Sequence, residues 1–299
     1  MSKKVIGIGE VLWDIFPKDR RLGGASCNFA YHCGQVGLQS VIVSRVGCDS
    51  LGTEMIQALN QSKTDTNYLQ KDAVHPTGTV LVRLDSKGVP TFEITENVAW
   101  DYVEMTKELE SLARSADAIC FGSLAQRKAR TKKTIYELIR LMPEKSLKIF
   151  DVNLRQHFYS REVLDHSLVL ANVLKVSEEE LPILANAFNL TGSVVSQLTH
   201  LLSRFKLKLI AYTRGGNGSL LLTADHSHDH LGCKAVVVDT VGAGDSFTAV
   251  ICWGLLHRLS LAEINALANQ TAAYVCSQAG AMPVLPQELV NQFNLLSQL

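Results

Sequence analysis

The sequence predicts an α/β protein with a mostly parallel central sheet flanked by helices, together with a small antiparallel β lid. Short runs of β-branched residues alternate with segments of helical periodicity along most of the 299 residues. This alternation is typical of parallel strands that are covered on both faces. The stretch 78–97 instead alternates apolar and polar residues around a turn signal at 86–88, which indicates a two-stranded antiparallel ribbon.

The elements before this ribbon begin with a predicted strand over 4–16, "KVIGIGEVLWDIF". A glycine turn then opens a helix in "GGASCNFAYHCGQVG", and a buried strand over 40–47 and a helix over 49–61 follow.

After the ribbon, strands are predicted over 116–123, 147–153, 173–177 and 206–215. Helices are predicted between them over 131–142, 162–171 and 178–188. We expect 218–223 and 234–239 to form a hairpin, followed by a helix over 247–259.

Length and composition favour one domain over 1–299, with lid segments at about 12–24 and 75–103 inserted into it. Lys plus Arg and Asp plus Glu each number 29, and this zero net charge argues against a nucleic-acid or membrane partner. No stretch reaches the ~20 apolar residues of a membrane-spanning helix. The start is too short and too acidic for a signal peptide, and seven cysteines without C-x-x-C suggest reduced thiols, so we expect a cytoplasmic protein.

Polar residues and glycines gather where the predicted strands end, which is where open α/β sheets bind ligands. Polar side chains and glycines of this kind are what the binding of a phosphate and a polyol would require. They are Asp14, Gly23, Gly24, Asn28, Asn153, Arg155, Ser177, Glu180, Thr213, Gly215, Gly218, Gly242, Gly244 and Asp245.

The string "DTVGAGDSF", 239–247, lies between an apolar run and a helix. The first N–H groups of a helix have no partner within it, and glycines allow an anion to approach them. Phosphoryl transfer needs such charge stabilisation and an acceptor for the nucleophile's proton, which Asp245 could supply. The alternative is a glycine-rich turn in which Asp245 only caps the helix. The string lacks the lysine of a Walker A loop.

"DTVGAGDSF" and "GGASCNFA" resemble the two signatures of the PfkB (ribokinase-like) family of carbohydrate kinases, and the resemblance extends from "GIGEVLWD" to "GAMPVLP". "TFEITENVAWD", "FGSLAQR" and "FDVNLRQHFYS" are most similar to the fructokinase branch. The resemblance implies a three-layer ribokinase-like fold. It also implies a transferase that uses ATP and Mg²⁺ to phosphorylate a small monosaccharide, with fructose converted to fructose 6-phosphate. K⁺ is a further cofactor that it suggests.

The resemblance also implies residue roles. Asp245 would be the catalytic base, and the amides of Gly242, Ala243 and Gly244 would form the anion hole. The expected substrate-binding residues are Asp14, Gly23, Gly24, Asn28, Asn153 and Arg155. The expected nucleotide-binding residues are Ser177, Thr213, Gly215, Gly218 and Asn269. Glu180 would organise magnesium through water, and a monovalent cation would lie among Asp239, Val241, Val275 and Gly280.

Several points stay open at this level. Ser177 replaces the family's usual asparagine, and Ser26 and Cys27 replace turn-forming residues. Arg155 could bind a phosphate or pair with Asp151. Ribose, 2-keto-3-deoxygluconate, tagatose or a nucleoside are alternative substrates, and a non-catalytic sugar or nucleotide sensor is the alternative from another class. A homodimer through the lid is compatible with the sequence. A dinucleotide-dependent dehydrogenase is excluded because Leu12 occupies the place of its third glycine.

Overall fold

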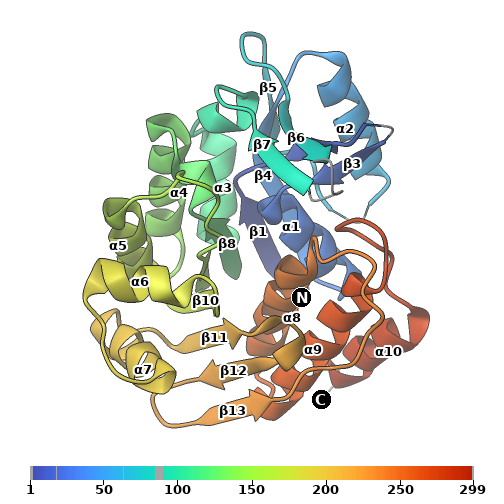
Figure 1. Ribbon diagram of the computed structural model, residues 1–299. Coiled ribbons are helices and arrows are strands. Elements are labelled where there is room, and N and C mark those ends of the chain that lie inside the picture. The colour runs from blue at the N-terminus through green and yellow to red at the C-terminus, as the bar shows by residue number, and fades with distance from the viewer. Residues whose placement is uncertain (1–2, 18, 63, 85–89, 298–299) are drawn as a thin grey trace.

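A computed structural model describes residues 3–17, 19–62, 64–84 and 90–297, and within them a central sheet of nine strands forms the middle layer (Figure 1). Neighbouring strands are parallel from β5 to β11, whereas β12 and β13 are antiparallel. The predicted α/β class is therefore confirmed. The strand order is β13 (Ser227–His230), β12 (Ser219–Leu222), β11 (Leu209–Thr213), β10 (Val173–Ser177), β9 (Leu147–Asp151), β8 (Ala118–Gly122), β1 (Lys4–Ile8), β4 (Gln39–Gly47) and β5 (Leu69–Asp72).

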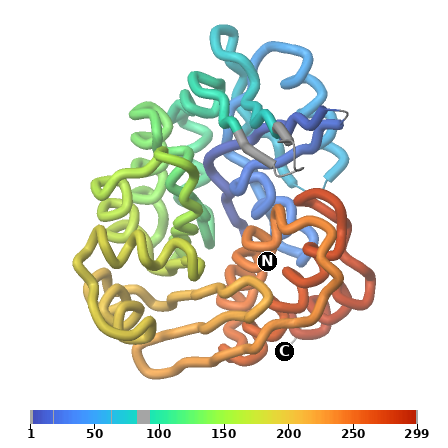
Figure 2. Tube along the Cα trace, viewed as in Figure 1, coloured from blue at the N-terminus to red at the C-terminus, as the bar shows by residue number. Residues whose placement is uncertain are grey.

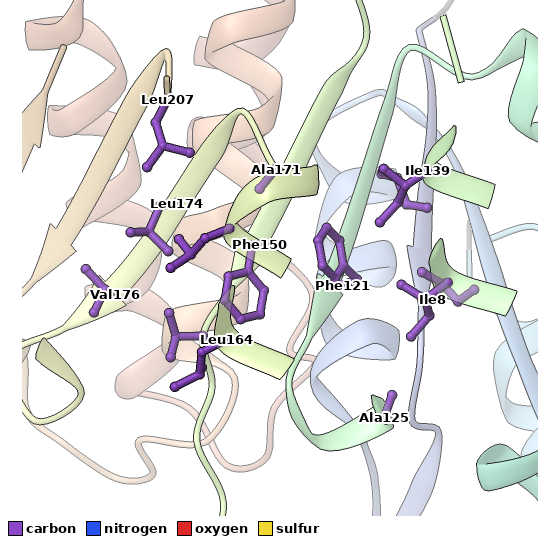
Figure 3. Packing of buried hydrophobic residues seen from close by; sticks show 14 of the residues in the cluster. Ile8, Phe121, Ala125, Ile139, Phe150, Leu164, Ala171, Leu174, Val176 and Leu207 are labelled. Atoms are coloured by element: carbon purple, nitrogen blue, oxygen red, sulfur yellow. The ribbon is translucent and has the colours of Figure 1, made fainter. Parts of the chain in front are cut away.

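Helices cover both faces of this sheet, and this explains why the strands are almost continuously apolar. On one face, Phe121 and Phe150 stack with their ring centroids 5.4 Å apart, among leucines such as Leu164 and Leu174 (Figure 3). The helices of this layer are α3 (Lys107–Ser115), α4 (Ala129–Leu141), α5 (Arg161–Leu170), α6 (Leu181–Phe188) and α7 (Val194–Arg204). The opposite layer contains α1 (Ala25–Gln35), α8 (Ala243–Leu256), α9 (Leu261–Cys276) and α10 (Gln287–Leu296). Helix α2 (Ser50–Asn60) packs Met55 and Leu59 against β4 and α1.

A second sheet of four strands, counted over the described residues, lies apart from the central one. Its order is β3 (Arg20–Gly23), β2 (Leu12–Ile15), β6 (Gly78–Leu84) and β7 (Pro90–Ile94). The parallel pairing of β2 with β6 brings two segments distant in sequence side by side, as the tube shows (Figure 2). Strands β6 and β7 form the predicted antiparallel ribbon. The turn predicted at 86–88 lies outside the described residues.

Two predicted elements are wrong. The single strand expected over 4–16 is two strands in different sheets, because the chain turns away from the central sheet at Gly9, whose φ is +145°. The hairpin partner of β12 is β13, not 234–239. The apolar run at 234–239 forms no strand, and its Val236 is 83% exposed. Hydrophobicity predicted a buried strand there, but part of this segment borders a cavity described below.

No helix in the part of the chain that the structure describes has both the length and the apolar character needed to cross a membrane.

Candidate active site

The N-terminus of α8 carries Asp245 in its first turn. Gly242 precedes the helix with φ +82°, and a Cβ there would lie 2.4 Å from the carbonyl oxygen of Ala281, so only glycine fits. Within the described residues, the N–H groups of Gly244 and Asp245 have no protein acceptor, and that of Ala243 makes only a long 3.4 Å contact with the Thr240 carbonyl. The turn therefore presents N–H groups that an anion can bind.

Asp245 is held by a residue from the opposite end of the chain. The Nδ2 of Asn28, on α1, donates to Oδ2 of Asp245 at 2.8 Å. Burial and repulsion from Asp151 raise the pKa of Asp245 to about 7, against the opposing effects of Asn28 and Lys175. A carboxyl with this pKa can accept a proton near neutral pH, which suits a general base. The Oδ1 of Asn28 is buried and has no hydrogen-bond partner in the described part of the chain.

A buried ion pair lies beneath this helix turn. Lys175 of β10 is paired with Asp151 of β9, with Nζ 3.1 Å from Oδ1. Oγ1 of Thr248 contacts the other oxygen of Asp151 at 3.0 Å. Burial disfavours the charged form of Lys175, but the carboxylates of Asp151, Glu180 and Asp245 outweigh it and raise the Lys175 pKa. Lys175 is therefore a cation next to the anion-binding turn.

Asp14, on β2 of the smaller sheet, faces the same region. Burial and repulsion from Asp239 raise the pKa of Asp14 to about 6, and Arg155 and Arg21 oppose this rise. A Cβ at Gly23, on the neighbouring strand, would lie 2.7 Å from Oδ2 of Asp14, so a larger residue there would displace this carboxylate. Gly24 has φ +104°, and a Cβ there would meet the Glu10 carbonyl oxygen at 2.4 Å. Gly23 therefore leaves room for the Asp14 carboxylate, and Gly24 allows the chain to pass close to the backbone of Glu10.

Arg155 is exposed, but its positive charge acts on three carboxyl groups of this region. Its charge lowers the pKa of Glu10, of Asp14 and of Asp245. Asp151 pairs with Lys175 rather than with Arg155. Asn153 is buried with φ +41°, and its carbonyl oxygen accepts a 3.2 Å hydrogen bond from Ser123.

A cavity of about 660 Å³ extends from the anion-binding turn toward α9 and the 233–240 segment. Asn269, one of its lining residues, donates to Oγ of Ser219 at 2.8 Å. Four of the five predicted nucleotide-binding residues line this cavity. Its polar or glycine lining includes Thr213, Gly215, Gly216, Gly218, Lys234, Thr240, Gly244 and Asn269. The fifth, Ser177, is not among its lining residues and lies one strand away, opposite Thr213 in the β10–β11 register.

Glu180 and Ser177 form a closed hydrogen-bond loop before α6. The backbone N–H of Ser177 donates to Glu180 at 2.8 Å, and that of Leu154 donates to its other oxygen at 3.0 Å. Burial alone would raise the pKa of Glu180, but Lys175 and these N–H groups lower it, so the carboxylate stays ionised. No group of three His, Cys, Asp or Glu side chains within the described ranges is arranged to hold a metal. Magnesium needs only one or two protein carboxylates when phosphates and water complete its shell, so Glu180 fits that role.

The predicted monovalent-cation residues lie around Asp239, whose carboxylate already has protein partners. The Asp239 carboxylate accepts from the backbone N–H of Val241 at 3.0 Å and of Gly280 at 3.1 Å. It also pairs with Arg21 of β3 at 3.0 Å. The carbonyl oxygen of Val275 already accepts from Gln278 at 3.0 Å. A guanidinium therefore already supplies the positive charge beside Asp239.

Sequence reasoning missed three charged residues of this region. Lys175 interrupts the apolar strand "VLKVS", which was the available signal for it. Glu10 is 1% exposed, and its Oε2 has no hydrogen-bond partner over the described ranges. Arg127 is buried against Asp101 at 2.7 Å and lies over the Trp100 ring at 4.0 Å. The partners of Glu10 and Arg127 are distant in sequence or come from irregular segments, and no periodicity indicates them.

The fold and this site define an α/β protein with an anion-binding helix terminus placed between a cavity and a carboxylate-lined region. The model of the pfkB family carbohydrate kinases matches residues 19–288, and the chain belongs to this family. A fructokinase of Klebsiella pneumoniae is 31% identical, and the alignment covers 96% of this chain and 97% of that protein.

Two solved structures agree with the fold along almost the whole chain. A fructokinase of Vibrio cholerae O395 with fructose, ADP and calcium has a TM-score of 0.82 and 27% identity, covering 97% of this chain and 98% of that one. An aminoimidazole riboside kinase of Salmonella enterica, with aminoimidazole riboside and an ATP analogue, has a TM-score of 0.80 and 26% identity, covering 99% and 100%.

Proposed function

We propose that this carbohydrate kinase transfers the γ-phosphate of ATP to a hydroxyl of fructose and forms fructose 6-phosphate. The observation that carries the proposal is the position of Asp245. Its carboxyl lies in the helix turn in which, over the described residues, the N–H groups of Gly244 and Asp245 have no protein acceptor, and Ala243 and Gly244 of this turn line one end of the 660 Å³ cavity. The hydrogen bond from Asn28 holds this carboxyl from α1, and the charge of Arg155 acts on both Asp245 and Asp14.

In this proposal the nucleotide occupies the cavity lined by Thr213, Gly215, Gly218 and Asn269. Asp14 accepts hydrogen bonds from sugar hydroxyls, since one carboxylate can accept two or more. Asp245 removes the proton of the attacking hydroxyl, and the N–H groups of 242–244 hold the transferred group while its bond to ADP breaks. Asn153 and Arg155 contribute to the sugar side, and Gly23 and Gly24 keep β3 close to Asp14.

Magnesium bound with ATP would neutralise phosphate charge, and Glu180 would hold its water shell. Closure of the smaller sheet over the sugar would exclude water, which competes as a nucleophile. A cytoplasmic location, where ATP is available, belongs to the same proposal.

The sugar is proposed as fructose because the curated relative from Klebsiella pneumoniae is a fructokinase and the Vibrio cholerae structure binds fructose. A riboside is the second candidate substrate, favoured by the similarity to the aminoimidazole riboside kinase. Among other differences from fructose, a riboside carries a base at its anomeric carbon, and this base needs additional room in the binding site.

The test is a coupled assay of ADP formation with Mg²⁺ and ATP, run on fructose, tagatose, ribose, 2-keto-3-deoxygluconate and ribosides. We expect the highest kcat/KM for fructose, with the phosphate at the 6-position by NMR of the product. A riboside with at least ~10-fold higher kcat/KM would replace fructose in the proposal. No turnover with any acceptor, together with intact ATP binding, would favour the non-catalytic sensor.

A further inference from the structure

Lys175 occupies an unusual place for a lysine. Its side chain is only 10% exposed, and it lies on the face of β10 that points toward α8. A Cβ added to Gly244 would lie 3.3 Å from Nζ of Lys175. The ammonium therefore lies directly beside the second residue of the anion-binding turn.

Packing alone does not explain a lysine at this position. The positive end of a helix dipole repels a cation, and the natural partner of a helix N-terminus is an anion. A buried ion pair such as Lys175–Asp151 also contributes little net stability compared with apolar side chains of similar volume. The flanking residues Leu174 and Val176 show that the strand accepts apolar residues on its other face.

The donors of Lys175 are only partly used. An ammonium carries three N–H donors, and Asp151 accepts from one of them. Asp151 is itself fixed on its other oxygen by Thr248, so it cannot rotate freely toward Lys175. On the side of Gly244, the absence of a side chain lets the ammonium lie against the turn, because a Cβ there would be 3.3 Å from Nζ.

An independent feature of the same region also indicates a ligand. Among the residues that the structure describes, the buried Oδ1 of Asn28 has no hydrogen-bond partner, although its Nδ2 is fixed on Asp245. An unpaired buried acceptor is costly unless a bound molecule satisfies it. A hydroxyl near Asp245 would do so, which puts the reacting oxygen on one side of Asp245 and Lys175 on the other.

We propose that Lys175 is a catalytic residue that binds the transferred phosphoryl group beside Gly244. The inference rests on the proposed kinase function. The sugar oxygen forms a bond to the γ-phosphorus, the bond from that phosphorus to the β,γ-bridging oxygen breaks, and its electron pair leaves with ADP. Asp245 receives the hydroxyl proton. Lys175 stays protonated throughout and donates hydrogen bonds to the negatively charged oxygens of the phosphoryl group. These bonds stabilise the charge while the attacking and leaving oxygens stay in line.

The test compares the D151N variant with the D151N/K175M double variant, so that no carboxylate is left buried without its partner. The double variant should fold because it replaces an ion pair by neutral groups of similar size, and D151N should be the less stable of the two, with the Lys175 charge still opposed by Glu180 and Asp245. Thermal unfolding checks this. We expect D151N to keep kcat within about 10-fold of wild type, and the double variant to lose a further ~10²-fold, the effect of removing one donor from an anion hole. K175R in the wild-type background should retain more activity than the double variant.

A binding measurement separates a phosphoryl contact from a structural role. Calorimetry is done with ADP alone and with ADP plus aluminium fluoride, which mimics the transferring phosphoryl group. The double variant should bind ADP like D151N but lose at least ~10-fold in affinity for the ADP–aluminium fluoride complex. Equal affinity of both variants for that complex, or equal kcat, would overturn the inference. Wild-type protein that binds this complex but phosphorylates no sugar would instead refute the proposed function alone.

Discussion

The Nδ2 of Asn28 donates to Oδ2 of Asp245 at 2.8 Å across 217 positions of the sequence. The bond joins the start of α1 to the start of α8, and so fixes the proposed base relative to α1. It also favours the ionised carboxylate and thereby opposes the burial that raises the pKa of Asp245. Burial, which raises the pKa of Asp245, and the hydrogen bond from Asn28, which lowers it, therefore act together to set this pKa at about 7.

The pH dependence of kcat/KM should show an acidic limb with an apparent pKa near 7, because Asp245 must be ionised to accept a proton. Asn28→Ala removes a bond to the ionised form, so the limb should move to higher pH. The measurement is a rate profile from pH 5.5 to 9 at subsaturating sugar. An unmoved limb in this variant would show that another group titrates.

Asp245→Asn should lower kcat by at least ~10²-fold, the usual contribution of a general base. The same change should stabilise the fold at pH 8. The pKa of Asp245 is raised on folding, so the native state binds more protons than the unfolded state, and stability falls as pH rises from about 4 toward 7.

We therefore expect Tm of this variant to rise by at least about 2 °C at pH 8 and to match wild type at pH 5. Calorimetric scans at both pH values test this. A stabilisation of equal size at pH 5 would contradict the assigned titration.

Arg21→Met should raise KM for the sugar near pH 6.5 and leave it unchanged at pH 8.5. Arg21 opposes the rise of the Asp14 pKa, which is about 6, so its loss leaves less of Asp14 ionised at the lower pH. Arg20→Met is the matched control, because Arg20 is the neighbouring residue of β3 and pairs with Glu54 instead. Equal KM changes at the two pH values would indicate lost packing rather than charge.

The rate of the wild-type enzyme should not depend on K⁺. The carboxylate of Asp239 is already paired with Arg21 at 3.0 Å and accepts two backbone hydrogen bonds. Initial rates in K⁺, Na⁺ or tetramethylammonium at constant ionic strength should agree within about 2-fold. A several-fold activation by K⁺ alone would show that a cation binds despite this pair.

Arg127→Met should destabilise the protein strongly. The side chains of Arg127 and Asp101 are 3% and 0% exposed, so the variant would leave a buried carboxylate uncompensated at a cost of about 3–5 kcal/mol. We expect Tm to fall by about 6–15 °C. Lys128→Met is the control, because its partner Glu96 is 48% exposed and such pairs contribute about 0–1 kcal/mol. A similar fall of Tm in both variants would contradict the prediction.

The sequence by itself determined the α/β class, the antiparallel ribbon and the turn before Asp245. These follow from local information: the periodicity of apolar residues and the glycines that a helix start requires. It also indicated which strand ends carry the polar groups of the cavity, since four of the five predicted nucleotide-binding residues line it.

Only the tertiary structure decided which distant groups meet. The strand predicted over 4–16 divides between two sheets at Gly9, and its second half pairs with β3 and β6. Lys175 meets Asp151 because β9 and β10 are neighbours in the sheet, and Arg21 reaches Asp239 across 218 positions. Strand order and side-chain pairing depend on contacts between segments far apart in sequence, and such contacts leave no periodic trace in a single chain.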